Sequence, residues 1–131
     1  MIIEHLGMAV PNPIKMGKWF EKNLGFRIIR ELGTDVEGVI FMADDRGNVL
    51  EIANIPEIKP MDFKSMNPLL IHLAIECADP MSEAKRLVAA GAEWIGEAIR
   101  NDYKGEKILV RDPYGGLTIQ LVNRQKALKQ S

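Results

Sequence analysis

Two histidines and two later oxygen-bearing residues are spaced in a way that suggests a metal site. The chain has only two histidines, His5 and His72, and each opens a short apolar run. Glu51 follows the first histidine by 46 residues, and Gln120 follows the second by 48. Two imidazoles, one carboxylate and one amide oxygen form a mixed ligand set that suits Zn, Ni, Co, Mn or Fe(II). We therefore hypothesise one divalent metal per chain, bound by these four residues.

The sequence around these residues is repeated. Asn12-Pro13 and Asp79-Pro80 are separated by 67 residues, the same offset as the two histidines, and Gly25 and Gly91 are separated by 66. Asn or Asp followed by Pro is typical of a helix N-terminus. Glycine is typical of the left-handed residue that ends a helix. An offset that holds through strand, turn and helix indicates two copies of one module.

Each copy is expected to contain a strand, a helix and three further strands. The strands after the helix are expected at 26–32, 36–43 and 48–54 in the first copy, and at 93–99, 106–111 and 117–122 in the second. The predicted fold is α+β, with tandem βαβββ modules over about 1–54 and 69–123, a linker at 55–68 and a C-terminal tail at 124–131. We expect a single domain over 1–131, because a module of roughly 50 to 60 residues has too small a core to be stable alone.

Alternation along the strands predicts which side chains share a face. Successive residues of a strand point to opposite faces of its sheet. His5 and His72 fall on the opposite face of their strands from the larger aliphatic residues. The same holds for Glu51 and Gln120. Taken singly, each of the four is more often an ordinary polar residue. Their matched repeat positions and matched alternation favour a shared metal site on the faces away from the helices.

Composition narrows the functions that are possible. A net charge of −1 gives no broad attraction to nucleic acid or to an anionic membrane. No apolar segment reaches the length of about 20 residues that a membrane-spanning helix needs. The N-terminus shows no signal peptide, and the one cysteine, Cys77, favours a reducing compartment. We expect a cytoplasmic protein whose partners are a small-molecule substrate and a second copy of itself.

Over nearly its whole length the chain resembles the vicinal-oxygen-chelate superfamily, which includes glyoxalase I, methylmalonyl-CoA epimerase, extradiol dioxygenases and fosfomycin- and bleomycin-resistance proteins. The resemblance is carried by residues 5–10 (HLGMAV), 19–26 (WFEKNLGF), 48–52 (NVLEI), 72–75 (HLAI) and 110–121 (VRDPYGGLTIQL). It implies a cup-shaped mixed sheet around a metal, with the helices outside, commonly in a homodimer. His5, Glu51 and His72 match the family's ligand positions, whereas Gln120 stands where many members carry a glutamate.

The function that this resemblance implies is that of a metal-dependent, glyoxalase-like lyase or isomerase. Such an enzyme would act on a small substrate with vicinal oxygens through an enediolate-like intermediate. Glu51 is the candidate catalytic base, because the amide of Gln120 cannot act as one. Arg100 and Tyr103 lie in a polar segment and are candidates for binding an anionic substrate.

Three alternatives stay open at the level of sequence. One is a non-catalytic protein that sequesters a small molecule, as bleomycin-resistance proteins do. The second is an enzyme resembling methylmalonyl-CoA epimerase, and the third is a metal-dependent resistance transferase. The presence of metal in the purified protein would separate the first alternative from the enzymes.

Overall fold

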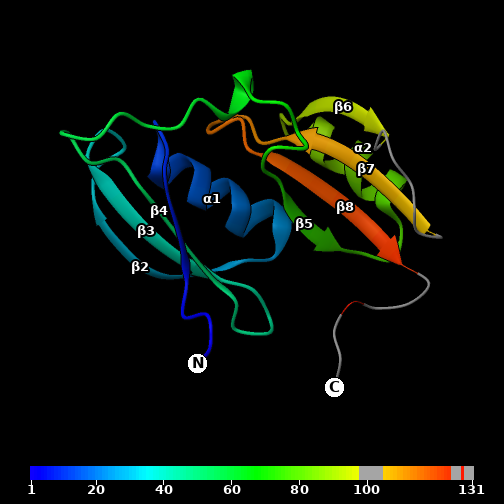
Figure 1. Cartoon of the computed structure of the whole chain (residues 1–131), viewed down its shortest axis with the longest axis horizontal. Coiled ribbons are helices and arrows are strands. Elements are labelled where there is room, and N and C mark those ends of the chain that lie inside the picture. The colour runs from blue at the N-terminus through cyan, green and yellow to red at the C-terminus, as the bar shows by residue number, and fades with distance from the viewer. Residues whose placement is uncertain (98–104, 125–127, 129–131) are drawn as a thin grey trace. The chain divides into compact units, whose positions relative to one another are not determined.

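The computed structural model describes residues 1–97, 105–124 and 128 of the chain. The chain divides into two compact units, Met1–Phe63 and Lys64–Ser131. Each unit contains one α-helix and a four-stranded mixed sheet (Figure 1). Both units follow the order β-α-β-β-β, which confirms the predicted α+β fold with tandem βαβββ modules. Within the described residues, no helix has the length and apolar character needed to cross a membrane.

The first unit has the strand order β1-β4-β3-β2. The strand β1 pairs with β4 in parallel, and the other neighbouring strands pair antiparallel. Its elements are β1 (Leu6–Ala9), α1 (Pro13–Leu24), β2 (Arg27–Gly33), β3 (Gly38–Ala43) and β4 (Val49–Ala53). The strand β3 begins two residues later than expected, because Thr34 and Glu37 close a turn through two hydrogen bonds.

The second unit repeats this arrangement with the order β5-β8-β7-β6. Its elements are β5 (Leu73–Glu76), α2 (Pro80–Ala89), β6 (Glu93–Glu97), β7 (Gly105–Arg111) and β8 (Thr118–Arg124). A short 3-10 helix, η1 (Phe63–Ser65), lies in the stretch that was expected to be a polar linker. Phe63 is only 1% exposed, so the predicted linker contributes one buried aromatic side chain to the core.

Both helices begin at the predicted prolines, but only one is capped as expected. Asp79 Oδ1 accepts a hydrogen bond of 3.1 Å from the backbone N–H of Ser82, which caps α2. The side chain of Asn12 makes no such bond, and only its carbonyl accepts from Met16 at the start of α1. Gly25 ends α1 with φ 74°, the left-handed conformation that glycine adopts without strain.

The core of each unit lies between its helix and one face of its sheet (Figure 1). In the first unit Phe20 of α1 is fully buried, as are Ile40 and Ile52 of the sheet. Burying a side chain of this size stabilises the fold by about 1.5–3 kcal/mol. A Cβ on Gly17 would lie 2.5 Å from Ile40 Cδ1, so α1 approaches β3 closely only because this residue is glycine. Ala84, fully buried, holds the matching position in α2.

The aliphatic face of β1 is covered less completely than the alternation predicts. Val10, just beyond the strand, is fully buried, but Leu6 is 53% exposed. The reason is that β1 is an edge strand, whereas α1 packs mainly on β3 and β2.

A buried carboxylate closes the turn between β7 and β8. Asp112 is 3% exposed, and its two oxygens accept hydrogen bonds of 2.6–2.9 Å from the backbone N–H groups of Tyr114, Gly115 and Leu117. Burial raises the pKa of Asp112 above its ordinary value, although the bonds from the turn oppose that effect. The turn therefore depends on one side chain that water cannot easily replace.

Replacing Asp112→Ala should lower the free energy of unfolding by at least about 2 kcal/mol, because a buried donor that loses its acceptor costs about 1–3 kcal/mol. Asp44 in the matching turn of the first unit is the control, since it accepts from Arg46 and Asn48 in an exposed setting. Water can replace that acceptor, so Asp44→Ala should cost less. Urea unfolding of both variants measures the difference, and equal losses would contradict this account of the turn.

Candidate metal centre

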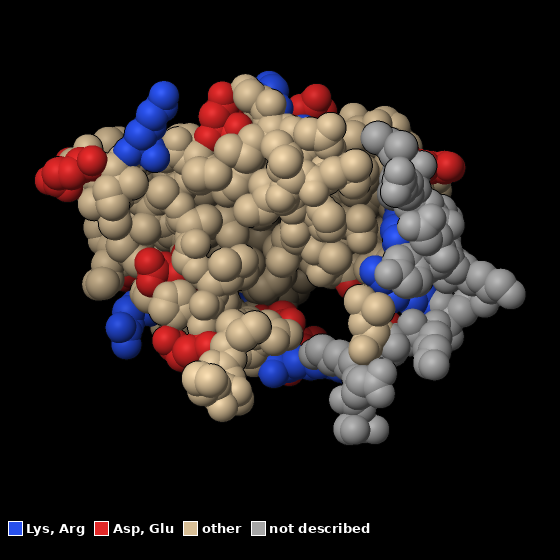
Figure 2. Space-filling view, in the orientation of Figure 1, with Lys and Arg blue, Asp and Glu red and all other residues tan. Residues whose placement is uncertain are grey.

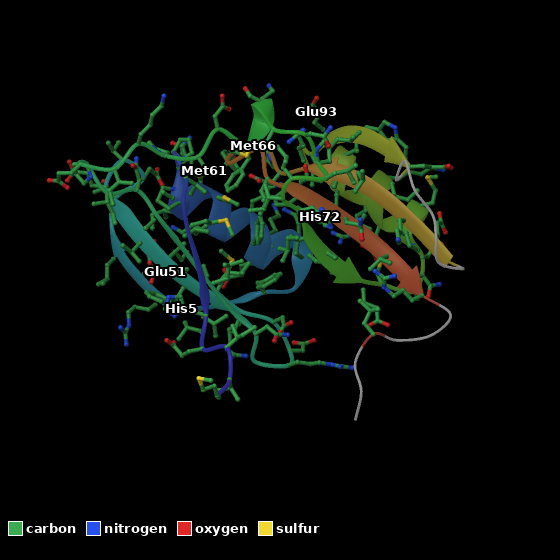
Figure 3. All side chains as sticks on the ribbon, viewed as in Figure 1. His5, Glu51, Met61, Met66, His72 and Glu93 are labelled. Carbon is green, nitrogen blue, oxygen red and sulfur yellow. The ribbon has the colours of Figure 1, made fainter. Side chains whose placement is uncertain are left out.

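His5 and Glu51 come together on the first sheet. The parallel pairing of β1 with β4 sets Gly7 beside Glu51, and His5 lies two residues before Gly7, on the same face. His5 Nε2 is 3.5 Å from Glu51 Oε2, and Figure 3 shows the two side chains next to each other. The two side chains are 32% and 29% exposed, so a metal or substrate can reach them from solvent.

Gly7 leaves room for these two side chains to meet. A Cβ at this position would lie 3.8 Å from Glu51 Oε1 and 4.0 Å from His5 Nε2. An alanine would therefore fit in ordinary contact, whereas a longer side chain would enter the space between the two donors. Ala74 occupies the matching position in the second unit, in agreement with this limit on size.

The same register recurs in the second unit. The parallel pairing of β5 with β8 sets Ala74 beside Gln120, and His72 lies two residues before Ala74. His72 and Gln120 thus belong to one face of the second sheet, as His5 and Glu51 do in the first. Gln120 is only 8% exposed and is more enclosed than its counterpart Glu51. In each module, strand pairing thus sets the residue two positions after the histidine beside the predicted oxygen donor.

Both imidazoles use Nδ1 in a hydrogen bond. His5 Nδ1–H donates to Glu4 Oε2, and His72 Nδ1–H donates to the carbonyl of Pro68, each at 2.9 Å. With the proton held at Nδ1, the neutral ring keeps its lone pair at Nε2. Metal-binding histidines commonly have such an acceptor, which fixes the ring and its tautomer. The sequence analysis missed Glu4, although a carboxylate next to a candidate ligand is a usable signal.

Arg111 holds the segment that leads to His72. Its guanidinium is mostly buried and donates to the carbonyl of Met66 at 2.8 Å and to that of Gly116 at 3.0 Å. The first bond fixes the backbone two residues before Pro68, the acceptor for His72. The second joins the same side chain to the turn that precedes β8, the strand of Gln120. Arg111 thus connects the two stretches of chain that position this donor pair.

Arg100 and Tyr103, proposed from sequence to bind substrate, lie outside the described residues. Cys77 alternates with His72 onto the other face of β5, and burial raises the pKa of its thiol, which disfavours the thiolate. Figure 2 shows acidic and basic side chains dispersed over the visible face, in keeping with the net charge of −1.

The chemistry of the four donors fits a divalent metal, but each unit supplies only two of them. Within residues 1–97, 105–124 and 128, no group of three His, Cys, Asp or Glu side chains is close enough to hold a metal. Imidazole nitrogen, carboxylate and amide oxygen are ligands that first-row divalent metals accept. The pair of His5 and Glu51 can in addition accept protons, whereas the amide of Gln120 cannot ionise.

Solved structures with this fold come from proteins of several descriptions. A glyoxalase family protein from Bacillus cereus has a TM-score of 0.75 at 13% identity, covering 96% of this chain and 95% of that chain. A variant of a fosfomycin resistance protein from Listeria monocytogenes, complexed with Mn(II) and dihydroxypropylphosphonic acid, has a TM-score of 0.71 at 18% identity, covering 98% and 94%. An antibiotic-binding protein from a Streptomyces species has a TM-score of 0.64 at 19% identity, covering 95% and 99%. At such identities the likeness shows the fold alone.

A search of curated proteins found no match to the chain. A family model, in contrast, matches residues 2–121, which include all four candidate donors and nearly all of both modules. The chain therefore belongs to the Glyoxalase/Bleomycin resistance protein/Dioxygenase superfamily.

Proposed function

We propose that the chain is a metal-dependent, glyoxalase-like lyase or isomerase acting on a small substrate with vicinal oxygens. The observation that carries this proposal is the approach of His5 Nε2 to Glu51 Oε2 at 3.5 Å. The same strand register recurs for His72 and Gln120. A histidine that only forms hydrogen bonds within the fold would not require an oxygen donor on the paired strand. Both modules nevertheless have such a donor at the matching position.

One divalent metal per chain is the proposed cofactor, with His5, Glu51, His72 and Gln120 as its ligands. The donor set suits Zn, Ni, Co, Mn or Fe(II). The Mn(II) complex of the Listeria protein supports this assignment, and the ligand named there has two adjacent hydroxyl groups. When bound, the metal would act as a Lewis acid toward two neighbouring substrate oxygens.

Glu51 is the proposed catalytic base. It is the one ionisable carboxylate among the four donors, and its side chain is 29% exposed, so substrate can reach it. A carboxylate oxygen can take a proton from a carbon next to a substrate carbonyl, whereas the neutral amide of Gln120 can only bind or donate hydrogen bonds. The imidazole of His5 bonds to Glu4 through Nδ1, so that Nε2 is the ring nitrogen on the side of Glu51.

A second candidate function is the sequestering of a small molecule without catalysis. The antibiotic-binding Streptomyces protein, whose fold is similar, favours it. The neutral side chain at Gln120 also agrees with a site that has no need of a second base. The two functions differ in the requirement for metal, so the metal content of the purified protein distinguishes them.

Metal titration tests the proposed ligands. The parent protein should bind close to one divalent ion per chain, measured by competition with a chromogenic chelator. Loss of a contact made to a ligand from outside commonly weakens metal binding by about 10- to 100-fold, so Gln120→Ala, which removes a ligand itself, should weaken it at least comparably. His72→Ala should weaken it more, because imidazole is the stronger donor. Gln120→Glu should strengthen binding, since it adds a negative charge.

The control for Gln120 is Asn123→Ala, which removes an amide from the opposite face of the same strand and should leave metal affinity unchanged. Unaltered affinity in Gln120→Ala would reduce the site to two histidines and Glu51. If the parent protein binds no metal after incubation with Ni, Zn, Co and Mn salts, the proposed metal-dependent enzymatic function is contradicted. That result would support the sequestering of a small molecule instead.

Removing the acceptor at His5 should weaken metal binding less than removing the imidazole. Glu4→Ala frees His5 to adopt either tautomer, so metal affinity should fall by about 10-fold, the low end of the effects of such outer contacts. Glu57→Ala, which removes another exposed carboxylate from the same unit, is the control for net charge. Nitrogen NMR of the metal-free protein should show the Nδ1–H tautomer of His5 in the parent alone. The same tautomer in Glu4→Ala would refute this role for Glu4.

We also propose that the protein is a homodimer. The strands β1 and β2 are open edges of the first sheet, and open edges are normally paired or covered. Next to β1, Ile2 and Ile3 are 94% and 91% exposed, an apolar surface that a second copy could cover. Sedimentation at micromolar concentration should give twice the chain mass of 14.7 kDa, and a particle of 14.7 kDa would contradict the proposal.

A further inference from the structure

A row of four residues crosses the first sheet at the level of the candidate metal ligands. Strand pairing sets Gly7 beside Glu51, Glu51 beside Phe41, and Phe41 beside Arg30. Directly paired residues share a face, so all four lie on the face opposite α1. The row therefore leads from the His5–Glu51 pair, over an aromatic ring, to a guanidinium.

A β-bulge places the charged residue in this row. The register of β2 with β3 shifts between Ile28 and Arg30, so that Ile29 has no direct partner. Without the extra residue, Ile29 would stand beside Phe41, and Arg30 would turn toward the helix side. Bulges near functional sites commonly re-aim a side chain in this way. The irregularity in β2 thus places the cation Arg30, in place of Ile29, directly beside Phe41.

Aromatic contacts hold the guanidinium toward the ligand pair. Arg30 Cζ lies 5.9 Å from the centroid of the Phe41 ring, within cation–π range. The Phe41 ring in turn meets the His5 ring edge-on, with centroids 5.7 Å apart and planes at 75°. No carboxylate of the described residues lies within ion-pair distance of Arg30, whereas Glu31, on the other face of β2, pairs with Lys18 at 3.5 Å. The charge of Arg30 is therefore available to a bound anion.

The second unit provides an internal comparison. Its corresponding row consists of Ala74, Gln120, Leu109 and Gly96, in the same strand order. It also contains a bulge at the same place, between Trp94 and Gly96, but no charged residue occupies the row. The fold thus requires the bulge and not the arginine. The cation at Arg30 is a feature of the first unit that stability of the module does not explain.

We infer that Arg30 forms an anion-binding subsite, so that the substrate carries an anionic group in addition to its vicinal oxygens. This inference rests on the proposed function and specifies its substrate class as an acidic small molecule. Two strand spacings separate the backbones of Arg30 and Glu51, or about 10 Å. The long arginine side chain shortens the gap, so a substrate with a few atoms between its vicinal oxygens and its anionic group would span it. Arg30 recognises charge, whereas the metal ligands recognise the oxygens.

Two ligands of equal length test the subsite. 2-Hydroxyglutarate and 2-hydroxypentanoate share an α-hydroxy acid, which offers vicinal oxygens, and only the first has a remote carboxylate. With Mn(II)-loaded protein, calorimetry should show that the parent binds 2-hydroxyglutarate about 10-fold more tightly or better, as expected for a charge-assisted contact. Arg30→Gln should abolish this preference and leave the affinity for 2-hydroxypentanoate unchanged. Arg46→Gln, the same change in the exposed turn before β4, should preserve it.

The outcomes separate the subsite from the proposed function. If Arg30→Gln binds Mn(II) and both acids as the parent does, the subsite is refuted while the metal site stands. If the parent shows no preference between the acids, the subsite is likewise refuted. If the parent binds no Mn(II), the proposed function fails and the subsite fails with it. Arg30 is exposed, so the variant should unfold in urea at the parent's midpoint, and a lowered midpoint together with loss of both acids would also count against a specific role.

Discussion

The parallel pairing of the first and last strands in each module is the constraint on which the candidate site depends. It sets Gly7 beside Glu51 and Ala74 beside Gln120, although the paired residues are more than 40 positions apart in the chain. A slip of one residue would turn Glu51 to the helix side and expose Leu50 and Ile52. The hydrophobic core therefore fixes the register, and the donor pairs inherit their positions from it. Few contacts within the site itself are needed to keep the ligands in place.

The two modules share this strand pairing but differ in the surroundings of their oxygen donors. In the first, Glu51 is partly exposed, and the neighbouring row carries an aromatic ring and a cation. In the second, Gln120 is almost enclosed, Asp112 closes the turn before its strand, and Arg111 joins that turn to the segment at Met66. The carboxylate of the first unit is thus partly accessible to solvent, whereas the amide of the second is buried.

Sequence reasoning predicted the features that local chemistry and periodicity determine. Pro13 and Pro80 mark helix starts because they need no backbone partner there, and alternation placed Glu51 on the open face of its strand. It did not predict the bulge at Ile29, because residues 26–32 read as one uninterrupted strand, and only the pairing with β3 reveals the shift. The buried guanidinium of Arg111 was missed for a similar reason, since its partner Met66 is distant in sequence. Contacts between segments decide these details, and no local pattern records them.

The balance of charges at the proposed metal site bears on which substrate it would bind. A metal held by two histidines and two glutamates would have its two positive charges balanced by the protein. Here Gln120 replaces one of the carboxylates, which leaves the proposed centre one negative charge short. Arg30 adds a positive charge to the face of the first sheet that carries Glu51. An acidic substrate would supply the missing negative charge, so the neutral amide of Gln120 and the positive charge of Arg30 would both favour such a ligand. Gln120→Glu should therefore strengthen the hold on the metal while weakening the attraction for an anion, because the added carboxylate would offset part of the metal's positive charge.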